Sequence, residues 1–315
     1  MLTKDHDITI VVPVYNRAKL VVRTLDSIYA QTHRPISLII VDNNSSDDSA
    51  AIVSQWATEH NSTDFSVSVT SETHPGAAAA RNHGLSLVDT PLVMFFDSDD
   101  TMRPGLVEQY LHHFNRHPDA EIIYTAAYTH DLKGNTYKLK ITRHHPLRNH
   151  IYHSILKTAG YACHTSLIRR VGAWDTDMRG WDDWVLGIRL LLATDKAYFM
   201  PGTYIDIYSQ VESITATDFS SRPRLWEDAL DRADMIIDAA NHRDQASLHR
   251  LIDYRRVILA AHYAREGAGQ QAHDLYSAVI NRPGQSRRMQ LLMSLVYHYT
   301  RLGGRGAATI VNPLI

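Results

Sequence analysis

Hydrophobic residues in the first hundred positions follow two alternating patterns. Short runs of apolar or β-branched residues, typical of buried strands, are separated by longer stretches in which apolar residues recur at helical spacing. We expect strands at residues 8–15, 37–42, 65–71 and 92–96, and helices at 17–32, 49–60 and 77–88. Strands that alternate with helices in this way predict an α/β fold built on a largely parallel, doubly wound sheet.

The pattern changes after this first segment. For residues 104 to 210 we expect a helix at 105–117, a strand at 121–128 and a helix at 181–193, with less regular sequence between them. After Pro223 the spacing of apolar residues predicts consecutive helices only. The chain therefore divides into residues 1–221 and a helical C-terminal region, residues 222–315.

Polar residues follow three of the predicted strands, at the point where each strand ends. Tyr15 and Asp42 end the first and second strands, Asn16 and Asn43 come directly after them, and Asp97 follows the fourth. In a parallel sheet the carboxyl ends of the strands border the crevice in which ligands bind. Three separate elements are therefore expected to bring carboxylate and amide groups to one crevice.

Three carboxylates lie within four positions in the stretch FFDSDD, and we call Asp97, Asp99 and Asp100 the Asp97 cluster. Like charges this close raise each other's pKa values unless positive charge lies among them. A hard divalent cation such as Mg²⁺ or Mn²⁺ would supply that charge, because these ions prefer oxygen ligands. The alternative is a polar turn whose Asp residues cap the next segment, which is the better interpretation of this motif taken alone.

Charge, cysteine content and the lack of long apolar runs indicate which partners and which cellular compartment to expect. A formal net charge of −2 gives no reason to expect nucleic acid as a partner. The single cysteine, Cys163, excludes an internal disulfide and fits a reducing compartment. The sequence shows no cleavable signal peptide and no apolar run long enough to cross a bilayer. We therefore expect a cytoplasmic protein.

Several motifs taken in order resemble family 2 of the glycosyltransferases, over residues 7 to about 210. They are PVYN (13–16), VDNNSSDDS (41–49), PGAAAARNHG (75–84), FFDSDD (95–100) and the stretch at 164–190 that contains GWDDW. The resemblance implies a GT-A fold for residues 1–221, with a nucleotide-binding half at 1–103 and an acceptor-side half at 104–221. It also implies transfer of a sugar from a nucleotide diphosphate donor to a hydroxyl, with inversion at the anomeric carbon.

The resemblance assigns the donor side residue by residue. Asp42 would accept a hydrogen bond from the imide N–H of uracil or thymine, which favours a UDP- or TDP-sugar. Pro13, Tyr15 and Asn16 would wall the base pocket, although Tyr15 equally suits a core position. Arg81 would approach the base or the diphosphate of the donor, and Asp97 would contact the ribose or the metal. Asp99 is the stronger candidate ligand for Mg²⁺ or Mn²⁺.

The acidic pair Asp182 and Asp183 matches the family's acceptor-side motif, whose second member is the proposed general base. Inverting transfer needs a base on the face opposite the leaving group, and the resemblance gives that role to Asp183. The alternative is that Asp183 caps a helix beginning at Trp184. Trp174 and Trp181 would offer stacking surfaces for a sugar acceptor, whereas Trp184 suits the protein core.

One segment departs from the family. Where many members carry Tyr-Arg and a nearby His after the final strand, this chain has YSQVES at 208–213. The third protein ligand of the metal and some phosphate contacts are therefore left without a candidate.

The C-terminal region has its own candidate function. Residues 282–305 carry five arginines and no acid, on both sides of the apolar stretch MQLLMSLVYHY. Such a helix can lie on an anionic membrane, which would suit a lipid-linked acceptor at the inner face of a membrane. The alternative, which we favour from sequence, is a helix packed on its neighbours with solvated arginines.

The sequence thus predicts an inverting, metal-dependent glycosyltransferase that acts in polysaccharide, lipopolysaccharide or other glycoconjugate synthesis. The alternative from another class is a non-catalytic nucleotide-sugar-binding or scaffold protein, against which the intact acidic residues argue. A nucleotidyltransferase would carry a Gly-rich basic loop after the first strand, and PVYNRAKL has none.

Overall fold

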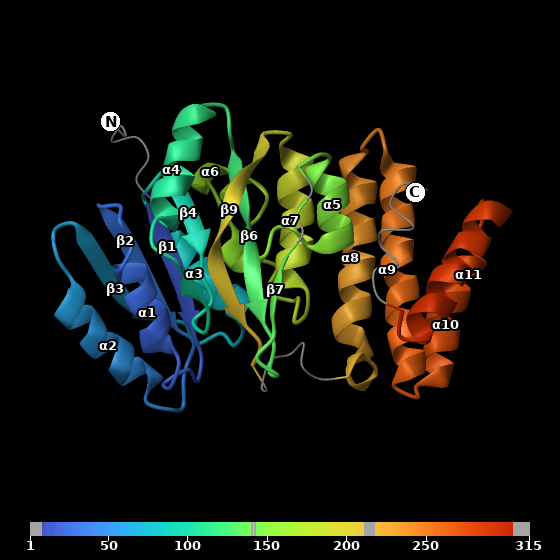
Figure 1. Ribbon diagram of the computed structural model, residues 1–315, viewed down its shortest axis with the longest axis horizontal. Helices are drawn as coiled ribbons and strands as arrows, with labels where there is room; N and C mark the ends of the chain where they lie inside the picture. Colours follow the sequence, from blue (N-terminus) through green and yellow to red (C-terminus); the bar gives the residue numbers. More distant parts are fainter. Residues whose placement is uncertain (1–7, 140, 142, 211–217, 305–315) are drawn as a thin grey trace. The chain divides into compact units, whose positions relative to one another are not determined.

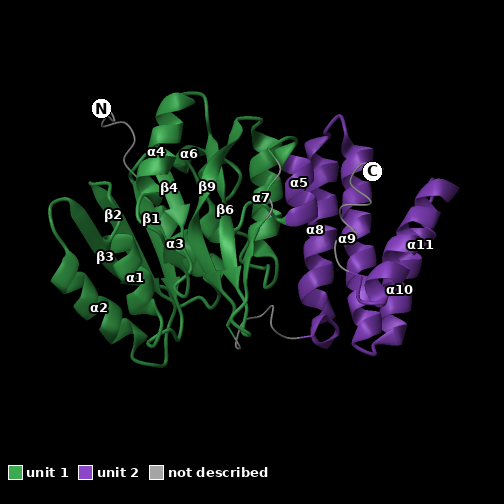
Figure 2. Ribbon diagram, viewed as in Figure 1, with its two compact units in different colours: residues 1–146, 154–211 green, residues 147–153, 212–315 purple. Residues whose placement is uncertain are grey.

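The computed structural model describes residues 8–139, 141, 143–210 and 218–304. The chain forms two compact units (Figure 2). The first, which we call the sheet unit, contains residues 1–146 and 154–211, and the second, the helical unit, contains residues 147–153 and 212–315. The chain therefore enters the helical unit twice.

The sheet unit is built on one mixed sheet, which has nine strands within the described residues (Figure 1). Its first half is parallel in the order β3-β2-β1-β4, as the alternation of strands and helices predicts. These strands are β1 (Ile8–Val14), β2 (Ile36–Asp42), β3 (Phe65–Ser71) and β4 (Leu92–Phe95). Every residue of β1 and β4 is buried, which explains their nearly continuous apolar sequence.

Strand directions mix in the second half of the sheet. Beyond β4 the order is β8-β6-β9-β5, and β7 pairs with β6. Strand β8 is antiparallel to both β4 and β6, whereas β6 and β9 are parallel. The bounds are β5 (Thr101–Met102), β6 (Ile122–His130), β7 (Thr136–Lys138), β8 (Tyr161–His164) and β9 (Ala197–Tyr208). Of these five, the sequence predicted only β6.

Helices cover both faces of the parallel half. They include α1 (Val21–Tyr29), α2 (Ser49–His60), α3 (Ala77–Ser86) and α4 (Leu106–Arg116), and the sheet unit also contains η2 (Thr158–Gly160), α6 (Thr165–Arg170) and α7 (Asp182–Ala193). Alternate residues of β1 share one hydrophobic cluster with α1, α2 and α4. On the opposite face α3 lies so near that a Cβ at Gly84 would stand 2.4 Å from Val11 Cγ1. Only glycine permits this approach, which brings α3 and its Arg81 close to the sheet.

The helical unit contains α5 (Pro146–His153) and the elements after residue 217. Those are η4 (Phe219–Ser221), α8 (Pro223–Ala240), α9 (Gln245–Arg265), α10 (Gly269–Ile280) and α11 (Arg287–Arg301). Pro146, the first residue of α5, is assigned to the sheet unit, and the rest of that helix to the helical unit. Helix α9 packs against α8, α10 and α11. Helix α5 joins it through the Tyr152 ring, stacked 4.7 Å from that of Tyr254, and through Arg255, which donates to the Ile151 carbonyl. None of the described helices has the length and apolar content needed to span a bilayer.

Candidate active site

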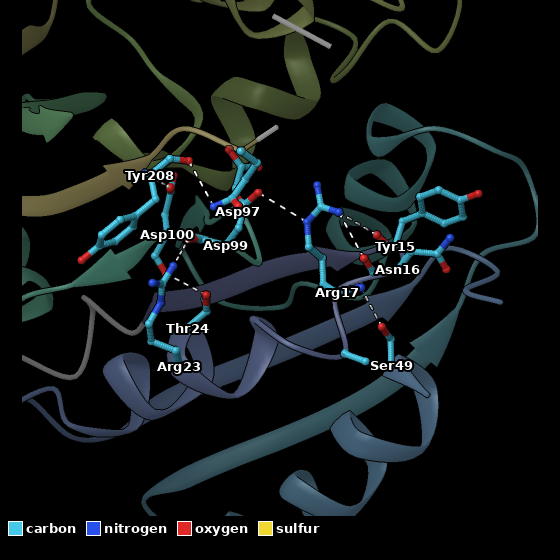
Figure 3. A network of polar contacts seen from close by, with 12 residues as sticks. Tyr15, Asn16, Arg17, Arg23, Thr24, Ser49, Asp97, Asp99, Asp100 and Tyr208 are labelled. Carbon is cyan, nitrogen blue, oxygen red and sulfur yellow. Dashed lines mark hydrogen bonds and ion pairs between the residues drawn. The ribbon is translucent and has the colours of Figure 1, made fainter. Parts of the chain in front are cut away.

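The Asp97 cluster follows the carboxyl end of the buried strand β4, which lies between β1 and β8 in the sheet. A tight turn follows, in which the Asp100 N–H donates to the Asp97 carbonyl over 3.2 Å. Asp100 is 4% exposed, and its Oδ1 accepts a hydrogen bond of 3.0 Å from the Tyr208 N–H at the end of β9. Asp100 is therefore a structural link between two strand ends, while Asp97 and Asp99 face outward from the turn (Figure 3).

Three arginines supply positive charge to these carboxylates. Arg17 Nε lies 3.4 Å from Asp99 Oδ2, and Arg23 donates to the Asp99 carbonyl over 2.6 Å (Figure 3). Arg81 donates to Asp97 Oδ1 over 2.7 Å. The sequence predicts a place for Arg81 at the site, whereas it places Arg17 and Arg23 in the amphipathic helix expected at 17–32. In the structure α1 begins only at Val21, because residues 17–20 form a turn.

Arg81 joins the two halves of the candidate site. It is 6% exposed, so the alternative of an arginine on an exposed helix surface is wrong. One Nη donates to Asp97 and the other to Asp182 Oδ2 over 2.9 Å, and its Cζ lies 4.3 Å from the centre of the Trp174 ring. Burial works to lower the pKa of Arg81, but attraction by Asp97 and Asp182 outweighs it, so the pKa is raised and the guanidinium stays charged.

Burial also governs the acidic side chains. It is the largest cause of a raised pKa at Asp99, where the charge of Asp97 adds to it and Arg17 opposes it. The pKa of Asp100 is well above its usual range for the same reason, with Asp97 as the next cause. At Asp182 burial raises the pKa although Arg81 opposes the shift. The three arginines therefore do not offset the effect of burial on these carboxylates.

Asp42 ends β2 and carries an unused acceptor. The carboxylate is 8% exposed, and its Oδ2 accepts from the Ser45 N–H over 3.1 Å. Its Oδ1 is buried and has no hydrogen-bond partner in the part of the chain that the structure describes. A buried carboxylate oxygen without a partner is costly, so this oxygen is suited to a donor group on a ligand.

The remaining residues predicted for the base pocket surround the end of β1. Pro13 lies within the strand and is paired with Val41 of β2. Asn16 has a left-handed backbone (φ 50°), and its side-chain oxygen accepts from the Ser46 N–H over 2.8 Å. Tyr15 is 56% exposed, which excludes the core position that its sequence left open.

The acidic pair lies in the first turn of α7. The helix begins at Asp182 rather than Trp184, and Trp181 precedes it with a left-handed backbone (φ 52°). Asp183 Oδ1 accepts from the Trp184 N–H over 2.7 Å, so this carboxylate is held at the helix N-terminus. Trp184 is fully buried, as expected of a core residue. Trp174 is 2% exposed, with Arg81 across its ring, so that face is not open to a sugar.

The donor set fits a hard divalent cation only in part. Asp97 and Asp99 offer carboxylate oxygens, and their repulsion contributes to the raised pKa of Asp99. Within the described residues, no group of three or more His, Cys, Asp or Glu side chains is placed to hold a metal. Two carboxylates suit Mg²⁺ or Mn²⁺ when substrate phosphates and water complete the coordination.

The departure after the last strand is partly explained by the neighbours of Tyr208. Val211, Glu212 and Ser213 lie outside the described residues. The Tyr208 ring has the Arg23 guanidinium 4.1 Å from its centre and the His130 ring stacked at 4.7 Å. His130 in turn bonds Asp206 over 2.7 Å. An arginine and a histidine thus flank this tyrosine from other elements, which sequence reading could not have placed there.

Comparison with known proteins places the sheet unit in a family. The family model described as Glycosyl transferase family 2 matches residues 9–176. Glycosyltransferase GlyG of Streptococcus pneumoniae is 29% identical over 135 residues, which are 43% of this chain and 44% of that protein. The chain spans less than half the length of the first curated relatives it matches.

Two solved structures share the fold across both units at low sequence identity. S. aureus TarS 1–349 in complex with UDP-GlcNAc matches with a TM-score of 0.68 and 16% identity, over 95% of this chain and 93% of that one. The mannosyltransferase PcManGT from Pyrobaculum calidifontis, in complex with GDP-Man and Mn²⁺, matches with a TM-score of 0.58 and 19% identity, over 98% of this chain and 87% of that one. The expected GT-A fold is confirmed, and the chain belongs to glycosyl transferase family 2.

Proposed function

We propose that this protein transfers a sugar from a nucleotide diphosphate donor to a hydroxyl group, with inversion at the anomeric carbon. The observation that carries the proposal is the double ion pair of Arg81, which joins Asp97 after β4 to Asp182 at the start of α7. Residues 85 positions apart in sequence thereby form one acidic site at the carboxyl edge of the parallel strands, where α/β proteins bind ligands.

Asp42 would select the base of the donor. Its unpartnered Oδ1 would accept the imide N–H of uracil or thymine, which favours a UDP- or TDP-sugar. Pro13, Tyr15 and Asn16 would border the base. TarS, a structural neighbour, has been crystallised with UDP-GlcNAc, which agrees with a uridine donor without fixing the sugar.

Asp97 and Asp99 would hold Mg²⁺ or Mn²⁺ beside the diphosphate. When bound, the cation would offset negative charge on the departing diphosphate. PcManGT was solved in complex with GDP-Man and Mn²⁺, which supports a divalent cation beside the donor here. Arg81 would keep Asp97 in position, since it is buried and pairs with that carboxylate at 2.7 Å.

Asp183 would act as the general base. Its Oδ1 is fixed by the first turn of α7, and it makes no ion pair with any described residue, so the carboxylate is available to remove the acceptor's proton. Asp182 is held by Arg81 and would position the pair. Trp181, which precedes the two acids, remains a candidate surface for the acceptor, whereas Trp174 would act by supporting Arg81.

The acceptor class follows from the relatives rather than from the site. The minor teichoic acid biosynthesis protein GgaB of Bacillus subtilis and the amylovoran biosynthesis glycosyltransferase AmsB of Erwinia amylovora are among the similar proteins. We propose a saccharide or lipid-linked acceptor in the synthesis of a polysaccharide or another glycoconjugate. A non-catalytic nucleotide-sugar-binding protein is the competing class, and it would not need the Asp183 carboxylate.

A cytoplasmic location with a peripheral membrane contact is a second proposal, supported by the exposed face of α11. Leu291, Leu295 and Leu302 are 63%, 61% and 88% exposed. Arginines at the two ends of α11 would attract anionic lipid, although Arg305 lies outside the described residues. Replacing Leu291 and Leu295 by serine should abolish co-sedimentation with phosphatidylglycerol vesicles. If the unchanged protein does not co-sediment, the contact does not exist.

The test of the proposed function is calorimetric titration with UDP, TDP, GDP and CDP, each with and without Mn²⁺. We expect UDP or TDP to bind only with Mn²⁺, and Asp42→Asn to lose most of that affinity because an amide can turn a donor toward the imide N–H. Donor turnover should then be followed with the matching sugar nucleotides. Absence of binding by all four nucleotides would contradict the proposal.

A further inference from the structure

Arg17 lies beside the Asp97 cluster, and the proposed function gives it no role. Its Nε lies 3.4 Å from Asp99 Oδ2, and the two side chains are 23% and 18% exposed. Its Nη1 donates to the carbonyl oxygens of Tyr15 and Asn16 over 3.4 and 3.1 Å (Figure 3). One guanidinium therefore joins the loop proposed to border the base to the carboxylate proposed to hold the metal.

The main chain of Arg17 is fixed independently of its side chain. The Arg17 N–H donates to Ser49 Oγ over 2.8 Å, and Ser49 is fully buried at the start of α2. The Arg17 carbonyl accepts from the N–H groups of Leu20 and Val21 over 2.8 and 2.9 Å, which closes the turn before α1. A change of side chain at this position therefore leaves these main-chain bonds intact.

The contacts of the Arg17 guanidinium are weaker than those of Arg81. Arg81 is buried, pairs with two carboxylates at 2.7 and 2.9 Å, and lies across the Trp174 ring. Arg17 is partly exposed and makes one longer ion pair, together with bonds to neutral carbonyl groups. Arg81 is built into the site, whereas the head group of Arg17 can leave Asp99 at small cost.

We propose that Arg17 is an exchangeable counter-ion of Asp99 that binds the donor's diphosphate. In the free protein its guanidinium neutralises Asp99. If a divalent cation were held at Asp99, its charge would repel the Arg17 guanidinium, which would then be free to turn away from that carboxylate. A nucleotide that reaches from the base loop to Asp99 places its diphosphate beside Arg17, whose planar donors match phosphate oxygens. This inference rests on the proposed function and names the residue that couples metal binding to diphosphate binding.

The decisive variant is Arg17→Gln, tested by two binding measurements on the full chain. Titration with Mn²⁺ alone, followed by the paramagnetic resonance of the free ion, should show affinity increased about fivefold, because Asp99 has lost its competing cation. Calorimetry with UDP in saturating Mn²⁺ should show affinity decreased about tenfold, because a charged phosphate contact is lost. Opposite signs distinguish this role from a structural one, since a damaged loop would weaken both.

Two matched variants sharpen the result. Arg23→Gln removes the same charge nearby, but Arg23 bonds the Asp99 carbonyl rather than the carboxylate, so Mn²⁺ affinity should change by less than about twofold. Arg17→Lys keeps the charge without the planar fork, and its UDP affinity should lie between those of the unchanged protein and Arg17→Gln. An increase in Mn²⁺ affinity as large in Arg23→Gln as in Arg17→Gln would overturn the inference.

The measurements also separate this inference from the proposed function. If the unchanged protein binds no UDP in the presence of Mn²⁺, the uridine donor site and the role of Arg17 both fail. If it binds UDP but Arg17→Gln matches it in both titrations, or weakens both, only the role of Arg17 is overturned.

Discussion

Acidic residues meet arginines in two regions of this protein, with different outcomes. In the helical unit Arg256 of α9 is 3.6 Å or less from Asp231, Asp234 and Asp253, and Arg282 lies 3.0 Å from Asp253 Oδ1. In the sheet unit Asp99 has a single ion pair at 3.4 Å, and Asp42 keeps a buried oxygen without a partner among the described residues. Each acid of the first cluster is paired with an arginine, whereas Asp42 in the second region has no ion pair among the described residues.

The difference shows what separates a structural ion network from a binding site. Both regions contain buried carboxylates, so burial and charge do not distinguish them. In the helical unit the two arginines come from different segments, and each of the three acids is paired with at least one of them. In the sheet unit the acids lie at the carboxyl ends of β2 and β4 and in the first turn of α7, and Asp42 among them has no ion pair in the described structure. A carboxylate without an ion pair at the carboxyl end of a strand is therefore the more informative sign of a binding site.

The largest effect is expected from Asp183→Asn, which removes a carboxylate that has no ion pair in the described structure. An amide cannot take the acceptor's proton, so the rate of transfer should fall about a thousandfold. Donor affinity should stay unchanged, because Asp183 lies outside the proposed base and metal contacts. Single-turnover kinetics and UDP calorimetry measure the two quantities. Loss of donor affinity would move Asp183 out of the base role.

The next largest effect is expected on stability, from a change in the ion-pair network of the helical unit. Arg256→Ala leaves three acids without their shared partner, of which Asp253 is nearly fully buried. The free energy of unfolding should fall by about 3 kcal/mol, as measured by urea denaturation of the full chain. UDP affinity in the folded protein should remain as before. Arg256→Lys, which retains the charge, should recover part of the stability, and a network without energetic importance would leave both variants at the stability of the unchanged protein.

Stability should also respond to pH through Asp253. Burial raises its pKa to about 6 from the ordinary 3.8, although Arg282 and Arg256 oppose the shift and Asp234 adds to it. The folded protein therefore binds more protons than the unfolded chain between these values, so the contribution of Asp253 is present below pH 4 and is lost as the pH rises through 6. The loss is at most about 3 kcal/mol. Asp253→Asn should remove this pH dependence, and an unchanged profile would contradict the raised pKa.

The smallest effect in free energy is expected for Asp99→Asn. Metal-dependent UDP affinity should fall about tenfold, because one of two proposed ligands becomes a weaker, neutral one. Stability should not fall, since a raised pKa means that the folded protein already disfavours the charged form of Asp99. Calorimetry with varied Mn²⁺ and thermal unfolding test the two statements. An unchanged Mn²⁺ requirement would exclude Asp99 as a ligand.

The parallel half of the sheet was predictable because β1 and β4 are entirely buried and therefore apolar, while the partly exposed β3 alternates apolar and polar residues. The second half was not, and β9 shows why. Pro201 and Gly202 interrupt its sequence, yet the pairing with β6 passes from Met200 directly to Thr203, so that these two residues form an irregularity in a continuous strand. The sequence alone gives no register from which such a bulge could be recognised.

The same limit applies to the site. Asp42 and the Asp97 cluster were predictable because each directly follows a hydrophobic strand. Arg17 and Arg23 have the sequence of an ordinary helix surface, and only the turn at residues 17–20 directs Arg17 toward Asp99. Whether Arg81 was exposed or buried depended on the packing of Gly84 against β1, which involves residues about seventy positions apart.

The two passages of the chain through the helical unit have a consequence for dissecting this protein. Helix α5 is encoded between β7 and β8, but its Tyr152 and Ile151 contact Tyr254 and Arg255 of α9. A fragment that stops at residue 221 would retain α5 and lose the helix that covers its buried side chains. Such a fragment should aggregate unless α5 is removed as well, so a boundary drawn as a single cut in sequence does not release an independent catalytic piece.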